Sequence, residues 1–113
     1  MLWQMRFPSG AVANCSTSYE SGYSSRLRVH AEKGWFGLDP AFGYRGNKGL
    51  RSDGKEINLP TPDLFAAEMD DFSRCILENR ESKVSGEEGL RDVKIIMAIY
   101  EAARTGRAVS LKG

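Results

Sequence analysis

Strand-like and helix-like stretches are segregated along this chain, and that order limits the fold more than any other feature of the sequence. Before residue 40, apolar and polar residues alternate in short stretches, whereas after residue 60 apolar residues recur at spacings of three and four. The first pattern is typical of strands and the second of amphipathic helices. Strands followed by helices predict an α+β fold, with an open, mostly antiparallel sheet and two carboxy-terminal helices packed on one of its faces.

The amino-terminal half predicts an antiparallel meander of at least four strands. Pro8-Ser9-Gly10 and Glu32-Lys33-Gly34 are turn sequences, because proline presets φ and glycine accepts positive φ. The two turns join four alternating stretches into two hairpins, over residues 2–7, 11–19, 25–33 and 35–38. The pattern is least regular between residues 40 and 60, where a turn at residues 52–54 allows two short strands around Leu50 and Ile57.

The first helix is expected to begin at Thr61, with Pro62 at its first helical position, and to end at Asn79. Its charged side includes Asp70 and Asp71, whose side chains diverge by about 100° because they are adjacent on a helix. We therefore expect a solvated face there rather than an acid–base pair. The apolar stripe on the other side comprises Leu64, Phe65, Met69, Phe72, Ile76 and Leu77.

The second helix is bounded by two capping signals. Ser85 and Glu88 have the spacing of a capping box, and Gly106 is typical of the position that follows a helix. Residues 108–111 are expected to return as a short strand. The apolar face of this helix is expected to comprise Leu90, Val93, Ile96, Met97 and Tyr100.

Length and charge limit the classes of function. A chain of 113 residues has room for a single domain over residues 1–113, and a net charge of +1 gives no electrostatic reason to expect nucleic acid or a membrane surface as a partner. No membrane-spanning run or secretory signal is visible, so we expect a cytoplasmic protein in which Cys15 and Cys75 are reduced and buried. The sequence has no CxxC or Cys/His cluster that predicts a metal site.

Two helices can cover only one face of a sheet, so the other face must meet water, a further domain or a second copy of the chain. Trp3, Trp35 and Phe36 provide more aromatic surface than two helices need, and they are the candidate interface residues. This interpretation predicts a homo-oligomer formed through the exposed sheet face. The alternative is that all three side chains lie in the core.

Few residues carry recognisable chemistry. His30, the only histidine, falls on the polar face of a strand without a nucleophile motif, so we expect a half-exposed strand residue. The glycine-rich segment 43–49 is followed by LRSDGKEINLP, which looks extended, whereas a phosphate-binding loop needs a helix directly after it. Tyr44 and Arg45 are the two residues of that segment with evident recognition chemistry, a phenol and a planar guanidinium.

Four strings resemble the carboxy-terminal domain of the glucose-fructose oxidoreductase / inositol dehydrogenase / MocA family: FPSGAVANCSTSY, RLRVHAEKGWFGLDPAFGYRG, FxxEMDDFSRCI and GEEGLRDVKIIMAIYEAARTGRAVSL. The glucose-fructose oxidoreductase-like branch is the most similar. The resemblance implies a domain that helps to form a sugar or polyol site and builds a dimer or tetramer through its sheet, beside a Rossmann domain that binds NAD or NADP. A tyrosine in the loop that matches PAFGYRG faces the substrate in similar enzymes, so Tyr44 is the one position that the resemblance carries over. Tyr44 and, by its chemistry alone, Arg45 are the substrate-binding candidates. The alternative for Tyr44 is a packing tyrosine at the edge of a sheet.

The chain departs from the family by lacking its glycine-rich turn after the first strand and its Glu-Lys-Pro motif, so no catalytic or cofactor-binding residue can be carried over. The first hypothesis is a truncated domain of an NAD(P)-dependent sugar or polyol oxidoreductase, inactive alone, with the Rossmann domain supplied in cis or in trans. The second is a stand-alone, non-catalytic binding or assembly module derived from the same domain. The third is a small independent enzyme that uses His30, or Tyr44 with Arg45.

Overall fold

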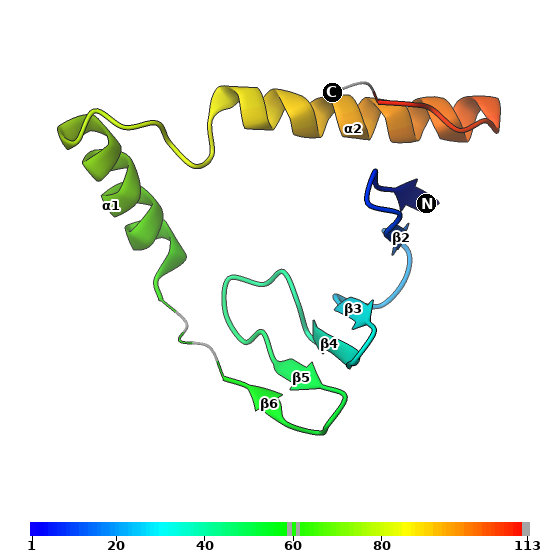
Figure 1. Cartoon of the computed structure of the whole chain (residues 1–113), viewed down its shortest axis with the longest axis horizontal. Coiled ribbons are helices and arrows are strands. Elements are labelled where there is room, and N and C mark those ends of the chain that lie inside the picture. The colour runs from blue at the N-terminus through cyan, green and yellow to red at the C-terminus, as the bar shows by residue number, and fades with distance from the viewer. Residues whose placement is uncertain (59, 61, 112–113) are drawn as a thin grey trace. The chain divides into compact units, whose positions relative to one another are not determined.

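The computed structural model describes residues 1–58, 60 and 62–111. Six strands precede two helices, which confirms the expected α+β class (Figure 1). The elements are β1 (Leu2–Arg6), β2 (Val12–Ser16), β3 (Leu27–Ala31), β4 (Gly34–Leu38), β5 (Gly49–Arg51), β6 (Glu56–Ile57), α1 (Leu64–Leu77) and α2 (Gly86–Thr105).

The chain divides into two compact units. One comprises Met1–Ser18 and Asp71–Gly113, and the other comprises Tyr19–Asp70. The first unit contains the β1–β2 hairpin and α2, the second contains strands β3 to β6, and α1 begins in the second and ends in the first. That residues 1–113 form a single domain stays a prediction.

The β1–β2 hairpin has the predicted partners and the predicted faces. Trp3 lies opposite Cys15 and Met5 lies opposite Ala13, so these four half-buried side chains share one face. On the other face the Gln4 amide donates a hydrogen bond of 2.9 Å to the Asn14 side chain. Alternation with a period of two was therefore sufficient to predict this hairpin.

Strands β3, β4, β5 and β6 form a second antiparallel sheet in that order. The β3–β4 hairpin turns at Glu32-Lys33, and β5 and β6 flank the predicted turn at residues 52–54. Gly37 is buried where β4 approaches β3, and a Cβ placed there would lie 2.2 Å from the Leu27 carbonyl oxygen. Only a residue without a side chain permits this spacing.

The expectation of one continuous meander is wrong for the described residues, because their strands fall into two separate sheets. Residues 17–26 separate β2 from β3, which is far longer than a tight hairpin turn. Ser25 at the end of this segment pairs with Ala41 instead of a neighbouring strand: its carbonyl accepts the Ala41 N–H at 2.8 Å, and its hydroxyl donates to the Ala41 carbonyl.

Helix α1 is capped by Asp63. One Asp63 carboxylate oxygen accepts the N–H groups of Phe65 and Ala66, both at 3.1 Å, which satisfies donors that have no partner inside the helix. Thr61, the expected cap, lies outside the described residues, and Pro62 precedes the helix instead of taking its first position. The helix ends at Leu77, and the predicted end residue Asn79 follows it with a φ of 50°, in the left-handed region that asparagine tolerates.

Helix α2 has the caps that its sequence predicts. The Ser85 hydroxyl accepts the Glu88 N–H at 3.4 Å, and Gly106 has a φ of 66° and donates its N–H to the Ala102 carbonyl at 2.9 Å. A hydrogen bond from its own backbone N–H, followed by one from the Ser85 hydroxyl, lowers the pKa of the Glu87 carboxyl. Both helix ends are therefore satisfied by local interactions.

The predicted orientation of α2 is wrong. Its half-buried apolar residues are Ile95, Ala98, Ile99 and Ala102, whereas the expected apolar face of Leu90, Val93, Ile96, Met97 and Tyr100 is exposed. The helix is apolar on more than one side, so periodicity alone could not select the side that is covered. The stripe on α1 is exposed as well, and Cys75 is that helix's one buried residue. Neither helix in the described part is long and apolar enough to span a membrane.

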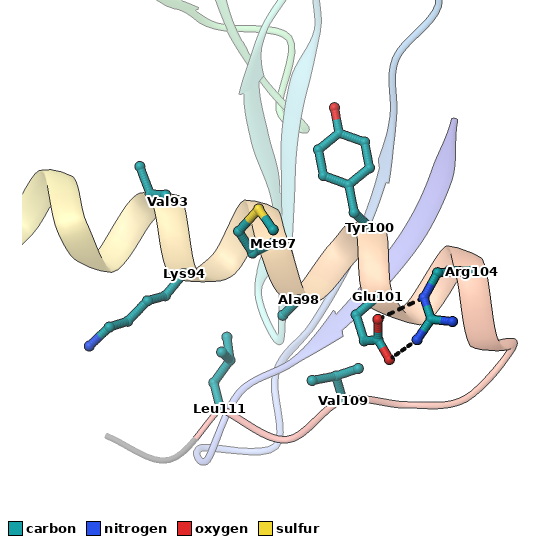
Figure 2. Close-up of a pocket in the computed structure, with 9 residues that line it drawn as sticks. All are labelled: Val93, Lys94, Met97, Ala98, Tyr100, Glu101, Arg104, Val109 and Leu111. Atoms are coloured by element: carbon teal, nitrogen blue, oxygen red, sulfur yellow. Dashed lines mark hydrogen bonds and ion pairs between the residues drawn. The ribbon is translucent and has the colours of Figure 1, made fainter.

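The predicted strand at residues 108–111 is also wrong: this segment forms no strand in the structure. The chain turns back after Gly106 and runs along α2, where Val109 and Leu111 line an open groove with Val93, Met97 and Tyr100 (Figure 2). The groove has a volume of about 650 Å³. The alternating sequence of this tail is compatible with a strand, but a strand also requires a paired edge.

Candidate functional site

The loop from Pro40 to Lys48 is held in place at both ends and across its middle. Ala41 is fully buried and pairs with Ser25, while the Asp39 N–H donates to the Lys48 carbonyl at 2.9 Å. The Asn47 side chain accepts the Gly43 N–H at 3.0 Å and donates to the Gly43 carbonyl at 2.9 Å. These bonds give an irregular sequence a defined conformation, as expected of a loop that presents functional side chains.

Tyr44 and Arg45 lie between the two residues of the Asn47–Gly43 clamp, and both are exposed. The Tyr44 ring contacts the Phe65 ring of α1, with centroids 5.1 Å apart and planes tilted by 40°. Their exposed fractions are 71% and 54%, so the pair presents aromatic surface to solvent. The sequence placed Phe65 only in the apolar stripe of a helix, and nothing in its spacing indicated a partner in the loop.

The candidate interface residues do not share one surface. Trp35 and Phe36 are adjacent in β4 and so point to opposite faces of the sheet. The Arg28 guanidinium lies 4.0 Å from the centre of the Trp35 ring, a cation–π contact that covers this half-buried side chain. Phe36 lies on the other face with Val29 and Leu27, and all three are exposed.

Trp3 is half-buried in the β1–β2 hairpin, which is a different sheet. Its indole Nε1 is buried and has no hydrogen-bond partner among the described residues. Tryptophan N–H groups usually find a partner when buried, so leaving this donor unpaired costs the hairpin some free energy of folding.

His30 is exposed on β3 opposite Trp35, and no described group of three histidine, cysteine or acidic side chains could hold a metal ion. The glycine-rich segment runs directly into strand β5 and not into a helix. The described residues therefore do not fit a nucleotide phosphate or a dinucleotide cofactor at this loop, because they lack the helix amino terminus that such a site uses.

The sequence did not indicate the ion-pair cluster at the end of α1. The Arg80 guanidinium donates to the Asp71 carboxylate at 2.6 Å, to the Glu78 carboxylate at 3.0 Å and to the Cys75 sulfur at 3.0 Å. The hydrogen bond from Arg80 holds the pKa of Asp71 below its usual value. Asp71 is thus part of a paired, half-buried cluster and not of a fully solvated face, which corrects the prediction for this residue.

Cys75 is buried and Cys15 is half-buried, and both are free thiols. The predicted burial is therefore correct for Cys75 and too strong for Cys15.

The sequence profile of the oxidoreductase family GFO/IDH/MocA, C-terminal alpha/beta domain, matches residues 1–111. The chain belongs to this family. Like the fold class, the membership agrees with the resemblance carried by the sequence motifs.

A solved structure of a family relative has the same fold as this C-terminal domain. The aldose-aldose oxidoreductase from Caulobacter crescentus, complexed with glycerol, is 43% identical, with a TM-score of 0.85 over 97% of this chain and 34% of that one.

Two relatives carry sugar dehydrogenase names. D-xylose 1-dehydrogenase [NADP(+)] of Haloarcula marismortui is 29% identical over 96% of this chain and 31% of its own length. D-xylose 1-dehydrogenase (NADP(+)) 2 of Haloferax volcanii is 27% identical over 95% of this chain and 35% of its own length. The chain thus spans about a third of the length of these curated relatives.

Proposed function

We propose that this C-terminal domain supplies the sugar-contacting loop and an association surface of an NAD(P)-dependent aldose oxidoreductase. The observation that carries the proposal is the clamped loop that presents Tyr44 and Arg45 beside Phe65. A phenol and a guanidinium can bond the hydroxyl groups of a sugar, while the rings offer an apolar surface. The xylose dehydrogenases and the aldose-aldose oxidoreductase among the relatives support an aldose as the substrate class.

The cofactor, NADP by the names of the relatives, would bind outside these 113 residues. The glycine-rich loop leads into strand β5 and not into the helix amino terminus that a dinucleotide phosphate site uses. We therefore propose that the chain alone does not catalyse hydride transfer. We also propose a cytoplasmic location, which two free thiols support.

The proposal is tested by assaying NADP⁺ reduction with D-xylose and D-glucose. The purified 113-residue chain should give no reduction above background, and the native polypeptide that contains it should reduce NADP⁺ with at least one aldose. Turnover by the chain alone would contradict the claim of inactivity. The native polypeptide could instead lack a dinucleotide-binding part and fail to reduce NADP⁺ with an aldose. That result would favour a stand-alone binding or assembly module.

Self-association through the four-stranded sheet is the second part of the proposal. Leu27, Val29 and Phe36 form an exposed apolar patch on one face, with Arg51 opposite Phe36 at its edge, whereas the other face has Arg28 over Trp35. A charge at the centre of an apolar interface is costly, so Phe36→Glu should reduce the assembly to monomers. A stable pair should bury on the order of 800 Å² per partner.

Leu50→Glu is the matched control, because Leu50 lies opposite Gly37 on the other face of the same sheet. Its side chain is 43% exposed, against 48% for Phe36. Sedimentation velocity at tens of micromolar should give oligomers for the wild type and Leu50→Glu and monomers for Phe36→Glu. A monomeric wild type, or equal loss in both variants, would contradict association through this face.

A further inference from the structure

The Tyr44–Phe65 contact joins the loop to a helix that begins sixteen residues after the loop ends. The backbone of the loop is fixed by Asn47 and by the Ser25–Ala41 pair. The Tyr44 side chain is not fixed in this way: its hydroxyl forms no hydrogen bond within the described residues, and its ring is 71% exposed. The Phe65 ring is therefore the feature that limits the orientation of Tyr44.

Phe65 itself is well placed for this role. It lies in the first turn of α1, where Asp63 accepts its N–H at 3.1 Å and fixes the start of the helix. The other members of its apolar stripe, such as Met69 and Phe72, are exposed. A centroid distance of 5.1 Å with a tilt is within the favourable range for aromatic pairs, so the contact is attractive and directional.

We infer that Phe65 orients the Tyr44 ring and is itself a binding residue, because the two rings form one wall that packs against the C–H face of an aldose in its ring form. The inference rests on the proposed function and adds a residue and a substrate shape to it. A pyranose has faces that present C–H groups, and the negative face of an aromatic ring attracts them. The Tyr44 hydroxyl at the edge of the wall, with Arg45 beside it, then remains available for sugar hydroxyl groups.

Phe65 would act on binding and not on the chemical step, because it touches Tyr44 and the sugar ring and no reacting atom. Its loss should raise KM with little change in kcat. A sugar without a ring face gains nothing from the wall, so glyceraldehyde, a three-carbon aldose, should be insensitive to the same change. A residue needed only for folding would instead affect every substrate alike.

The test uses Phe65→Leu in the native NADP-reducing polypeptide, with D-xylose and glyceraldehyde as substrates. Leucine keeps an apolar side chain of similar size but removes the ring. We expect KM for D-xylose to rise about two- to tenfold, the range that an aromatic pair is worth. We expect kcat and the KM for glyceraldehyde to stay within about twofold, and Phe65→Tyr to behave as the wild type.

Phe72→Leu is the matched control, since Phe72 lies in the same helix and is 59% exposed, against 54% for Phe65. Its KM for D-xylose should not change. The inference would be overturned if KM for D-xylose were unchanged in Phe65→Leu, if KM rose equally for both substrates, or if it rose equally in both variants. The proposed function would still stand in these cases, provided that the wild type is active. If none of the tested aldoses supported NADP⁺ reduction by the wild type, the proposed function would be overturned, and the inference with it.

Discussion

The four-stranded sheet and helix α2 differ in what holds them in place: the sheet is short and irregular but has buried residues, whereas the helix is long and regular but has none. The sheet has strands as short as Glu56–Ile57 and an irregular loop, yet Gly37, Ala41 and Gly49 in this region are buried. Helix α2 runs for 20 residues with a cap at each end, yet none of its residues is buried. Regularity in the helix comes from bonds within the helix, whereas the order of the sheet comes from close approach between neighbouring strands and between Ser25 and Ala41.

Because of this difference, substitutions should affect the stability of the two regions in different ways. The sheet and its loop already contain the contacts that define them, so substitutions that widen those contacts should be costly. The apolar residues Leu90, Val93, Ile96, Met97 and Tyr100 of α2 are exposed, so few contacts with other segments hold them. Substitutions on the exposed sides of α2 should therefore act through backbone preference and not through packing.

The largest effect is expected at Gly37 in the sheet. A Cβ at this position would lie 2.2 Å from the Leu27 carbonyl oxygen and 3.1 Å from the Arg28 Cα, and backbone atoms cannot easily move away. Gly37→Ala should therefore lower the free energy of unfolding by about 1–3 kcal/mol, the usual cost of overpacking. Urea unfolding of the protein measures this as a lower midpoint.

Gly22→Ala is the control for Gly37, because a Cβ at Gly22 meets nothing within 4 Å and its φ is not in the left-handed region. Its midpoint should equal or slightly exceed that of the wild type. If both variants unfolded at the wild-type midpoint, the sheet would not depend on close strand approach, and the contrast with α2 would lose its basis.

The sequence predicted features whose cause lies within a few residues. Ser85, Gly106, Asn79 and the turn at residues 52–54 are examples, because a cap or a tight turn is decided by its own neighbours. The β1–β2 hairpin was predictable for the same reason. These features determine the α+β class and the order of the elements.

The remaining features depend on partners that sequence spacing does not reveal. Arg80 reaches back nine residues to Asp71, and Phe65 meets Tyr44 across residues 45–64. The covered side of α2 depends on the segments that pack against it, and Ser25 pairs with Ala41 of the loop and not with strand β2. At the site, Tyr44 and Arg45 could be nominated from the loop's resemblance and chemistry, but the residue that orients Tyr44 could not.

Smaller changes in the free energy of unfolding are expected in α2, a decrease at one glycine and an increase at another. Gly106 has a φ of 66°, so Gly106→Ala should lower the free energy of unfolding by about 0.5–1 kcal/mol through strain at the cap. Gly89 lies inside the helix, where a Cβ meets nothing within 4 Å, and Gly89→Ala should raise the free energy of unfolding by about 0.5–1 kcal/mol. Thermal unfolding followed by circular dichroism at 222 nm measures both.

The pair of opposite shifts sharpens the comparison with the sheet, because both substitutions add one methyl group to the same helix. If α2 were covered on all sides, the methyl group at Gly89 would meet a neighbour and the gain would disappear. A loss of stability in Gly89→Ala would therefore show that the helix is packed around that position, contrary to its open surroundings in the structure.

The smallest effect on the free energy of unfolding is expected at the Asp71–Arg80 pair, which lies in neither the four-stranded sheet nor α2. The two side chains are 37% and 32% exposed, so water screens much of their attraction. Because the folded state lowers the pKa of Asp71 below its ordinary value of 3.8, the pair stabilises the fold fully above that pH. The stabilisation is lost as the pH falls through the lower, folded-state pKa, where the carboxylate takes up a proton.

Asp71→Asn should accordingly be less stable than the wild type at pH 7, and the difference should shrink as the pH falls below 3.8. Asp70→Asn is the control, because it removes a neighbouring, exposed carboxylate that has no ion pair among the described residues. Urea midpoints at a series of pH values between 2.5 and 7 measure both. If the difference in urea midpoint between Asp71→Asn and the wild type stayed constant down to the lowest pH, the hydrogen bond from Arg80 would not depend on the charge of the carboxylate. The cluster would then resemble the neutral Asn47 clamp of the loop.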